Sequence, residues 1–153
     1  MDLYLPGFQN IVAALIPMML GMVWFHPKVF GEAWMKGANL NPEYAKGANM
    51  PLLSAVGFVM ALIISSFLKS YAIFHEGTPA DATFLHGAFH GVTLGAMLGL
   101  PTLISANLWE RKSLNYYVIV SVYWLICFAL MGGVMFAWRS GYAEIAKAMG
   151  MGG

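Results

Sequence analysis

Two histidines four residues apart, His86 and His90, are the residues whose type and spacing best fit a chemical site. On a helix this spacing puts both imidazoles on one face, with Cβ atoms about 5–6 Å apart. Imidazole nitrogens so placed suit a transition metal ion such as zinc or copper. His75, Glu76 and Asp81 lie in the loop just before the pair, and Asp2 is on the same side of the membrane, so further potential ligands gather there. The predicted metal ligands are His86, His90, His75 and Glu76. The alternative is that His86 lies at the membrane interface and His90 only hydrogen-bonds to another helix.

Enzymatic chemistry has little support in the sequence. A zinc-protease helix carries the pattern H-E-x-x-H, and the residue after His86 is Gly87 instead. No nucleophile–base pair, phosphate-binding glycine loop or pair of intramembrane carboxylates is found, so no catalytic residue is predicted. The formal net charge of +1 gives no basic surface for nucleic acid.

A ladder of glycines accompanies the histidines, with one glycine at every fourth position. Such a stripe lets two helix backbones approach closely in a membrane, where packing replaces the hydrophobic effect. The ladder therefore predicts a helix-packing surface, for another helix of the same chain or for a second copy in a homo-oligomer. Its members are Gly87, Gly91, Gly95 and Gly99.

The elements that carry these residues are predicted from the distribution of charge. Apolar residues make up 59% of the 153 residues and charged residues 10%, and the mean hydropathy is +0.68. A membrane-spanning helix needs about 20 mainly apolar residues, and every long stretch without Asp, Glu, Lys or Arg exceeds that length. The uncharged stretches are 3–27, 47–68, 82–109 and 113–138.

We therefore expect an all-α, polytopic membrane protein with a single domain over residues 1–153. Pro17 and Pro101 each remove a helical hydrogen bond and predict local irregularity within the first and third spans. Lys69, near the end of the second span, is expected to reach the headgroups. The four predicted spans are 8–26, 51–74, 82–108 and 115–138.

The first loop is longer than the others and contains a patterned segment, 28–47, that predicts a short interfacial helix. Orientation follows from the Lys and Arg residues: five lie on the side of loops 1 and 3, and three on the side of the termini and loop 2. The positive-inside rule then places loops 1 and 3 in the cytoplasm.

One stretch at the end of the first span, "WFHPKVFGEAWMK", resembles the W-Y-x-P…F-G-x-x-W motif of the domain of unknown function 1761 family. "HGAFHG", "NLWERKS" and "LMGG" extend the resemblance over nearly the whole chain. The resemblance implies a small four-helix membrane protein from a bacterium and brings no assigned reaction. We expect that membrane to be the inner membrane. By physical chemistry the motif is an interfacial anchor, because aromatic side chains favour the headgroup region. Its residues are Trp24, Pro27, Phe30, Gly31 and Trp34.

The sequence thus predicts a non-enzymatic, oligomeric membrane bundle that serves as a scaffold, an accessory subunit or a small channel or transporter. Its partners would be the lipid bilayer and a second copy or another membrane protein. The alternative function is binding of a metal or cofactor through His86 and His90.

Overall fold

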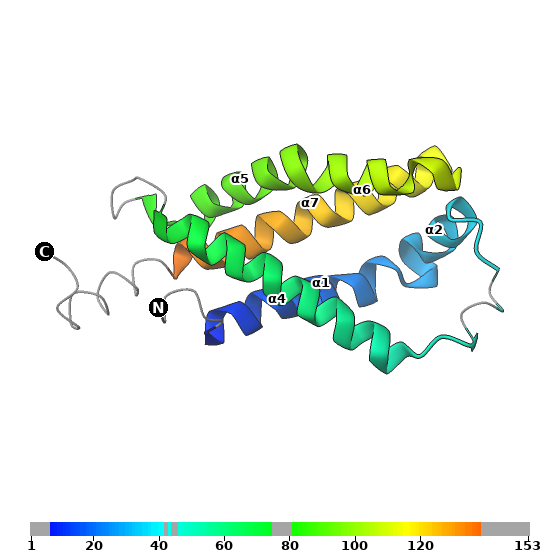
Figure 1. Ribbon diagram of the computed structural model, residues 1–153, viewed down its shortest axis with the longest axis horizontal. Helices are drawn as coiled ribbons and strands as arrows, with labels where there is room; N and C mark the ends of the chain where they lie inside the picture. The colour runs from blue at the N-terminus through cyan, green and yellow to red at the C-terminus, as the bar shows by residue number, and fades with distance from the viewer. Residues whose placement is uncertain (1–6, 42, 44–45, 75–80, 139–153) are drawn as a thin grey trace, which may run out of the picture.

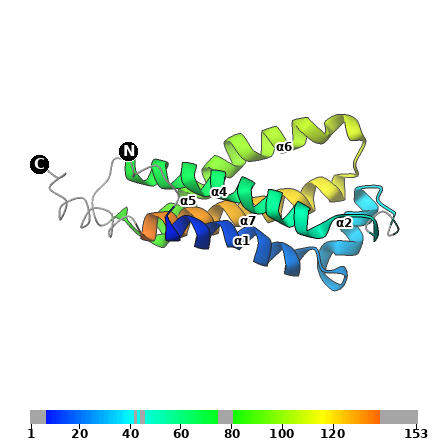
Figure 2. The same ribbon diagram turned by 60° about the horizontal axis from the view of Figure 1, so that its bottom comes forward.

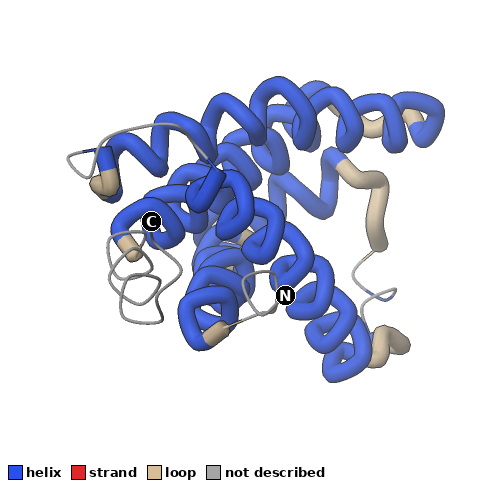
Figure 3. The backbone as a smooth tube through the Cα atoms, turned by 60° about the vertical axis from the view of Figure 1, so that its left-hand side comes forward, coloured by secondary structure: helices blue, strands red, loops and turns tan. Residues whose placement is uncertain are grey.

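The computed structural model describes residues 7–41, 43, 46–74 and 81–138, and this part of the chain contains helices and turns without a strand (Figure 3). The predicted all-α class is therefore confirmed. The elements in order are α1 (Phe8–Trp24), the π-helical turn η2 (Pro27–Gly31), α2 (Glu32–Gly37), α4 (Met50–Phe74), α5 (Phe84–Leu94), the π-helical turn η4 (Gly95–Gly99), α6 (Leu100–Asn107), the 3₁₀ turn η5 (Leu108–Glu110) and α7 (Leu114–Ala137).

Three described segments are long and apolar enough to cross a membrane: α4, the run Phe84–Glu110, and α7. The first predicted span differs, because α1 has 17 residues and covers about 26 Å at 1.5 Å per residue. It is followed by Pro27–Gly37 at a bend of 62°, and the pair makes a fourth candidate span if it is counted as one. The chain is thus a polytopic membrane protein with three such helices, or up to four.

Each long helix runs antiparallel to the one before it in the chain, so each end of the molecule gathers elements that are far apart in sequence (Figure 1). In Figure 1, α2 and the turn before α7 lie at one end, while α5 begins and α4 and α7 end at the other. Helix α7 is central, because α1, α2, α4 and α5 all contact it. The core lies toward the end where α7 finishes, and it comprises Ala13, Leu68, Ala72, Met131, Met135 and Phe136.

Glycines make the contact between α5 and α7 unusually close. A Cβ atom added at Gly87 would collide with the backbone oxygen of Gly132, and one added at Gly91 would collide with that of Phe128. Gly132 faces Gly87 in return, so the two backbones meet without side chains between them. The stripe predicted from the sequence therefore lies against α7 of the same chain, and a second copy is not needed to explain it.

The third membrane segment is irregular halfway along. The π-helical turn η4 ends two residues before Pro101, whose ring nitrogen cannot donate a helical hydrogen bond. Beyond this point α6 has no buried residue, and Figure 2 shows it diverging from the rest of the bundle. By contrast, α1 continues as one helix through Pro17, and its bend comes only at the turn before Pro27.

The first loop is attached to the start of α7 by its backbone. The amide of Ser113 donates to the Gly37 carbonyl at 3.0 Å, and Lys112 Nζ donates to the Ala38 carbonyl at 2.9 Å. Gly37 permits this contact, because a Cβ there would lie 2.6 Å from Ser113 Oγ. The part of the predicted interfacial segment that forms α2 is therefore packed on the bundle. Residues 42, 44 and 45 lie outside the described part.

Candidate functional site

Three helix ends build the site: the last turns of α4 and α7 and the first turns of α5. The Thr83 hydroxyl begins α5 by accepting a hydrogen bond from the His86 amide at 3.2 Å. The α5–α7 glycine contact then brings the histidine face of α5 beside Phe136 of α7. The elements that form the core therefore also position the imidazoles.

The two predicted histidines point toward each other. The Nε2 atoms of His86 and His90 are 3.0 Å apart, and their ring centroids are 4.6 Å apart. Both side chains are half-buried. At this distance one nitrogen carries the hydrogen and the other accepts it, or both nitrogens turn their lone pairs to a shared cation.

His90 is held on its second nitrogen as well. The Tyr71 hydroxyl, from α4, lies 3.3 Å from His90 Nδ1. The Phe136 ring stacks on the His90 imidazole with 5.3 Å between centroids and 15° between planes. Tyr71, His90 and His86 thus form a hydrogen-bonded chain across two helices, supported by an aromatic ring from a third.

Other polar side chains are buried on the inner side of the same region. Asn10 of α1 donates from Nδ2 to Ser65 Oγ of α4 at 3.3 Å, and both residues are fully buried. Lys69, one turn beyond Ser65, is only 5% exposed, and its reach to the headgroups stays a prediction. The apolar composition of α4 gives no sign of which turn faces inward, and sequence reasoning therefore missed these positions.

The other two predicted ligands, His75 and Glu76, lie outside the described residues. Among the residues that are described, no group of three or more His, Cys, Asp or Glu side chains is placed to hold a metal ion. The metal-ligating part of the site that the structure describes is the pair of imidazoles. The lone Cys127 is buried in α7.

The tryptophan-led motif forms a separate aromatic cluster at the opposite end of the bundle. Trp24 packs on Phe30 with 4.6 Å between centroids, and Phe25 packs on Trp34 at 5.2 Å and on Tyr123 at 4.9 Å. The Trp24 indole donates to the Ile119 carbonyl at 3.2 Å. The motif therefore ties the bend after α1 to α7.

Pro27 and Gly31 shape the backbone of that bend. The His26 carbonyl accepts from the Gly31 amide at 3.0 Å, five residues on, which makes the turn π-helical. A Cβ at Gly31 would collide with the Phe25 carbonyl oxygen. The motif therefore has the geometry of a structural anchor.

A comparison with protein families gives one match. The family model described as "Protein of unknown function (DUF1761)" matches residues 9–136, which is most of the chain. No curated protein and no solved structure matches the chain. The match contains both the histidine pair and the aromatic motif, and its description names no activity.

Proposed function

The chain belongs to the DUF1761 family, and from the geometry of its site we propose that it is a non-enzymatic membrane protein that holds a transition metal ion between His86 and His90. The observation that carries the proposal is the 3.0 Å separation of the two Nε2 atoms. Ionisable side chains at membrane depth are costly and mark functional sites by default. Imidazole is the side chain that suits zinc, copper, iron and nickel alike.

The separation favours some metals over others. Two nitrogens 3.0 Å apart, each about 2.05 Å from one ion, subtend about 94° at that ion. Tetragonal copper(II) takes ligands near this angle. Tetrahedral zinc needs nitrogens about 3.4 Å apart, which requires a small rotation of one ring. By the separation of the two nitrogens, copper(II) fits the pair more closely than tetrahedral zinc does.

The surroundings of His90 support the same assignment. A metal-binding imidazole almost always donates its other ring N–H to a nearby oxygen, which fixes its tautomer and orientation. Tyr71 supplies that oxygen at 3.3 Å, and the stacked Phe136 ring restrains the plane of the imidazole. We propose that water and the earlier side chains His75 and Glu76 supply the remaining ligands.

The cellular location, the orientation and the oligomeric role of the protein are also proposals. We place the protein in a bacterial inner membrane with loops 1 and 3 in the cytoplasm, and expect it to act as an oligomeric scaffold, accessory subunit or small transporter. Gly87 and Gly91 face α7 of the same chain, so a homo-oligomer would have to use another surface. Metal binding does not depend on the oligomeric state, because both histidines belong to one helix.

Metal binding is tested by loading detergent-purified protein with Cu²⁺ or Zn²⁺, removing free metal, and measuring metal per chain by elemental analysis. We expect about one equivalent in the wild type and a loss of most of it in His86→Gln and His90→Gln. Glutamine is polar and of similar length, so it can still form hydrogen bonds at the site, but it removes the imidazole nitrogen that binds the metal.

The matched control is His26→Gln. His26 is exposed at the opposite end of the bundle, where its Nδ1 accepts from the Lys28 amide. This variant should retain the wild-type metal content. Equal metal in all four proteins, or none in any of them, would overturn the proposal, provided that each protein elutes as a folded species.

A further inference from the structure

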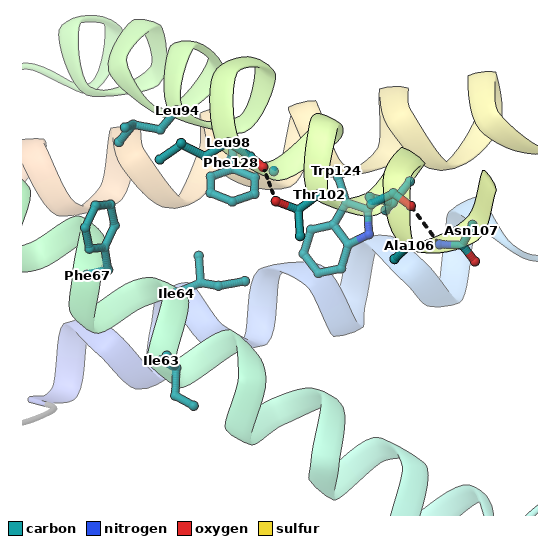
Figure 4. A pocket seen from close by; sticks show the side chains of 12 residues that line it. Ile63, Ile64, Phe67, Leu94, Leu98, Thr102, Ala106, Asn107, Trp124 and Phe128 are labelled. Atoms are coloured by element: carbon teal, nitrogen blue, oxygen red, sulfur yellow. Dashed lines mark hydrogen bonds between the residues drawn. The ribbon is translucent and has the colours of Figure 1, made fainter. Parts of the chain in front are cut away.

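A cavity of about 710 Å³ lies between α4, α6 and α7, away from the histidine pair (Figure 4). Ile63, Ile64 and Phe67 of α4 form one wall, and Trp124 and Phe128 of α7 form its floor. Its volume is within the range of about 300–1,000 Å³ that is typical of small-molecule sites. No charged residue is found among the described residues that line it.

The cavity results from the irregular third segment. Cβ atoms built at Gly95 and Gly99 would lie 3.1 Å from the Phe128 side chain, so the segment is packed on α7 up to this point. After η4 and Pro101 the helix diverges, and α6 leaves the space beside Trp124 unfilled. π-Helical turns within α-helices are frequently found at functional sites.

One polar group in this space has no partner. Among the described residues, the indole N–H of Trp124 has no hydrogen-bond acceptor. Two other polar side chains of the lining donate within their own helix: Thr102 to the Leu98 carbonyl and Asn107 Nδ2 to the Leu103 carbonyl. The cavity therefore offers an occupant the Trp124 donor in mainly apolar surroundings.

The position of the Trp124 indole N–H along α7 limits the classes of compound that could occupy the cavity. Trp124 is ten residues into α7, about 15 Å along the helix from its start. The acyl chain of a phospholipid has no acceptor at such a depth, and a charged ligand would find no counter-charge in the lining. The rings of Phe67, Trp124 and Phe128 provide flat apolar surfaces for a planar group.

We propose that this cavity binds a neutral, lipid-soluble carbonyl compound of the isoprenoid quinone class. A carbonyl oxygen accepts from Trp124 Nε1, the ring packs against Phe67 and Phe128, and the tail leaves between α4 and α6 into the lipid. This site is independent of the proposed metal centre, which lies at the other end of α5.

The test measures binding of decylubiquinone to the purified protein in detergent, by equilibrium dialysis with the quinone quantified by absorbance. We expect one saturable site per chain in the wild type. Trp124→Phe keeps the ring but removes the donor, and it should weaken binding about threefold to tenfold, as expected for one hydrogen bond. Ala106→Phe fills the cavity from α6 and should abolish binding.

Two controls distinguish binding in the cavity from uptake elsewhere on the protein. Trp109→Phe changes a tryptophan that is 87% exposed and outside the cavity, and it should bind like the wild type. His86→Gln should also bind normally, whatever its metal content. Unsaturable uptake, or equal affinity in the wild type, Trp124→Phe and Ala106→Phe, would overturn the proposal. The proposal would also be overturned if a phospholipid occupied the cavity and decylubiquinone did not compete with it. The same holds if Ala106→Phe dissociated a dimer of the chain that decylubiquinone left intact.

Discussion

At the scale of single residues, His90 is the centre of the site. It contacts His86 through Nε2, Tyr71 through Nδ1 and Phe136 through its ring face. Sequence spacing was enough to place the two histidines on one face, because four residues make about one helical turn. The partners Tyr71 and Phe136 could not be predicted, since they come from two other helices whose rotation depends on packing.

Removing the Tyr71 hydroxyl tests whether it orients His90 for metal binding. Outer-shell partners of metal-binding histidines typically change affinity by about 10- to 100-fold. We expect Tyr71→Phe to weaken Cu²⁺ binding about tenfold or more while one equivalent still binds at saturation, as measured by competition with a chelator. Tyr117→Phe is the matched control, because its hydroxyl donates to the Asn107 carbonyl far from the site. The same loss in both variants would mean that Tyr71 has no specific role.

Gly91 tests the close contact between α5 and α7. A Cβ at Gly91 would collide with the Phe128 carbonyl oxygen. Because this oxygen belongs to the backbone, the collision can be relieved only by moving one of the two helices. We expect Gly91→Ala to lower the free energy of unfolding by about 2 kcal/mol or more, measured by circular dichroism during denaturation in detergent.

The comparison for Gly91→Ala is Gly57→Ala, because nothing lies within 4 Å of a Cβ at Gly57 on α4. That change should be neutral or stabilising, since alanine favours helix by about 1 kcal/mol over glycine. Stability equal to the wild type in Gly91→Ala would show that the two backbones are not in contact.

At the scale of elements, the sequence predicts where the membrane spans lie. It predicts only some of the places where those helices are irregular. The predicted spans 51–74 and 115–138 agree with α4 and α7 to within one residue at each end, because a span must be mainly apolar over about 20 residues. Pro101 correctly indicated a disturbed third span. Pro17 left α1 continuous, and the bend came instead at Pro27, where the aromatic cluster and the π-helical turn determine the direction of the chain.

Gly31 is the residue on which that bend most depends. A Cβ at this position would meet the Phe25 carbonyl, so the π-helical turn would have to open. We expect Gly31→Ala to lower the melting temperature in detergent and to shift tryptophan fluorescence, as Trp24 and Trp34 lose their aromatic neighbours. Gly47→Ala, where a Cβ meets nothing within 4 Å, should match the wild type. Identical behaviour of the two variants would contradict the role given to Gly31.

At the scale of the whole molecule, the orientation is a prediction from charge. Five Lys and Arg residues lie on the side of loops 1 and 3, and three lie on the side of the termini and loop 2. The positive-inside rule then places loops 1 and 3 in the cytoplasm. In a Cys127→Ser background, Asn49→Cys should react with an impermeant maleimide only from the cytoplasmic side, and Ala82→Cys only from outside. The reverse pattern would overturn the orientation.

The central claim, that His86 and His90 bind one metal ion together, is tested most directly by X-ray absorption spectroscopy of the copper-loaded protein. We predict a signal from imidazole ligands with copper–nitrogen distances of about 2.0 Å in the wild type, and a signal from one imidazole fewer in His86→Gln. A copper spectrum that is the same in the wild type and in the His86→Gln, His90→Gln double variant would contradict the account. The histidine pair would then be a hydrogen-bonded packing contact between α4, α5 and α7.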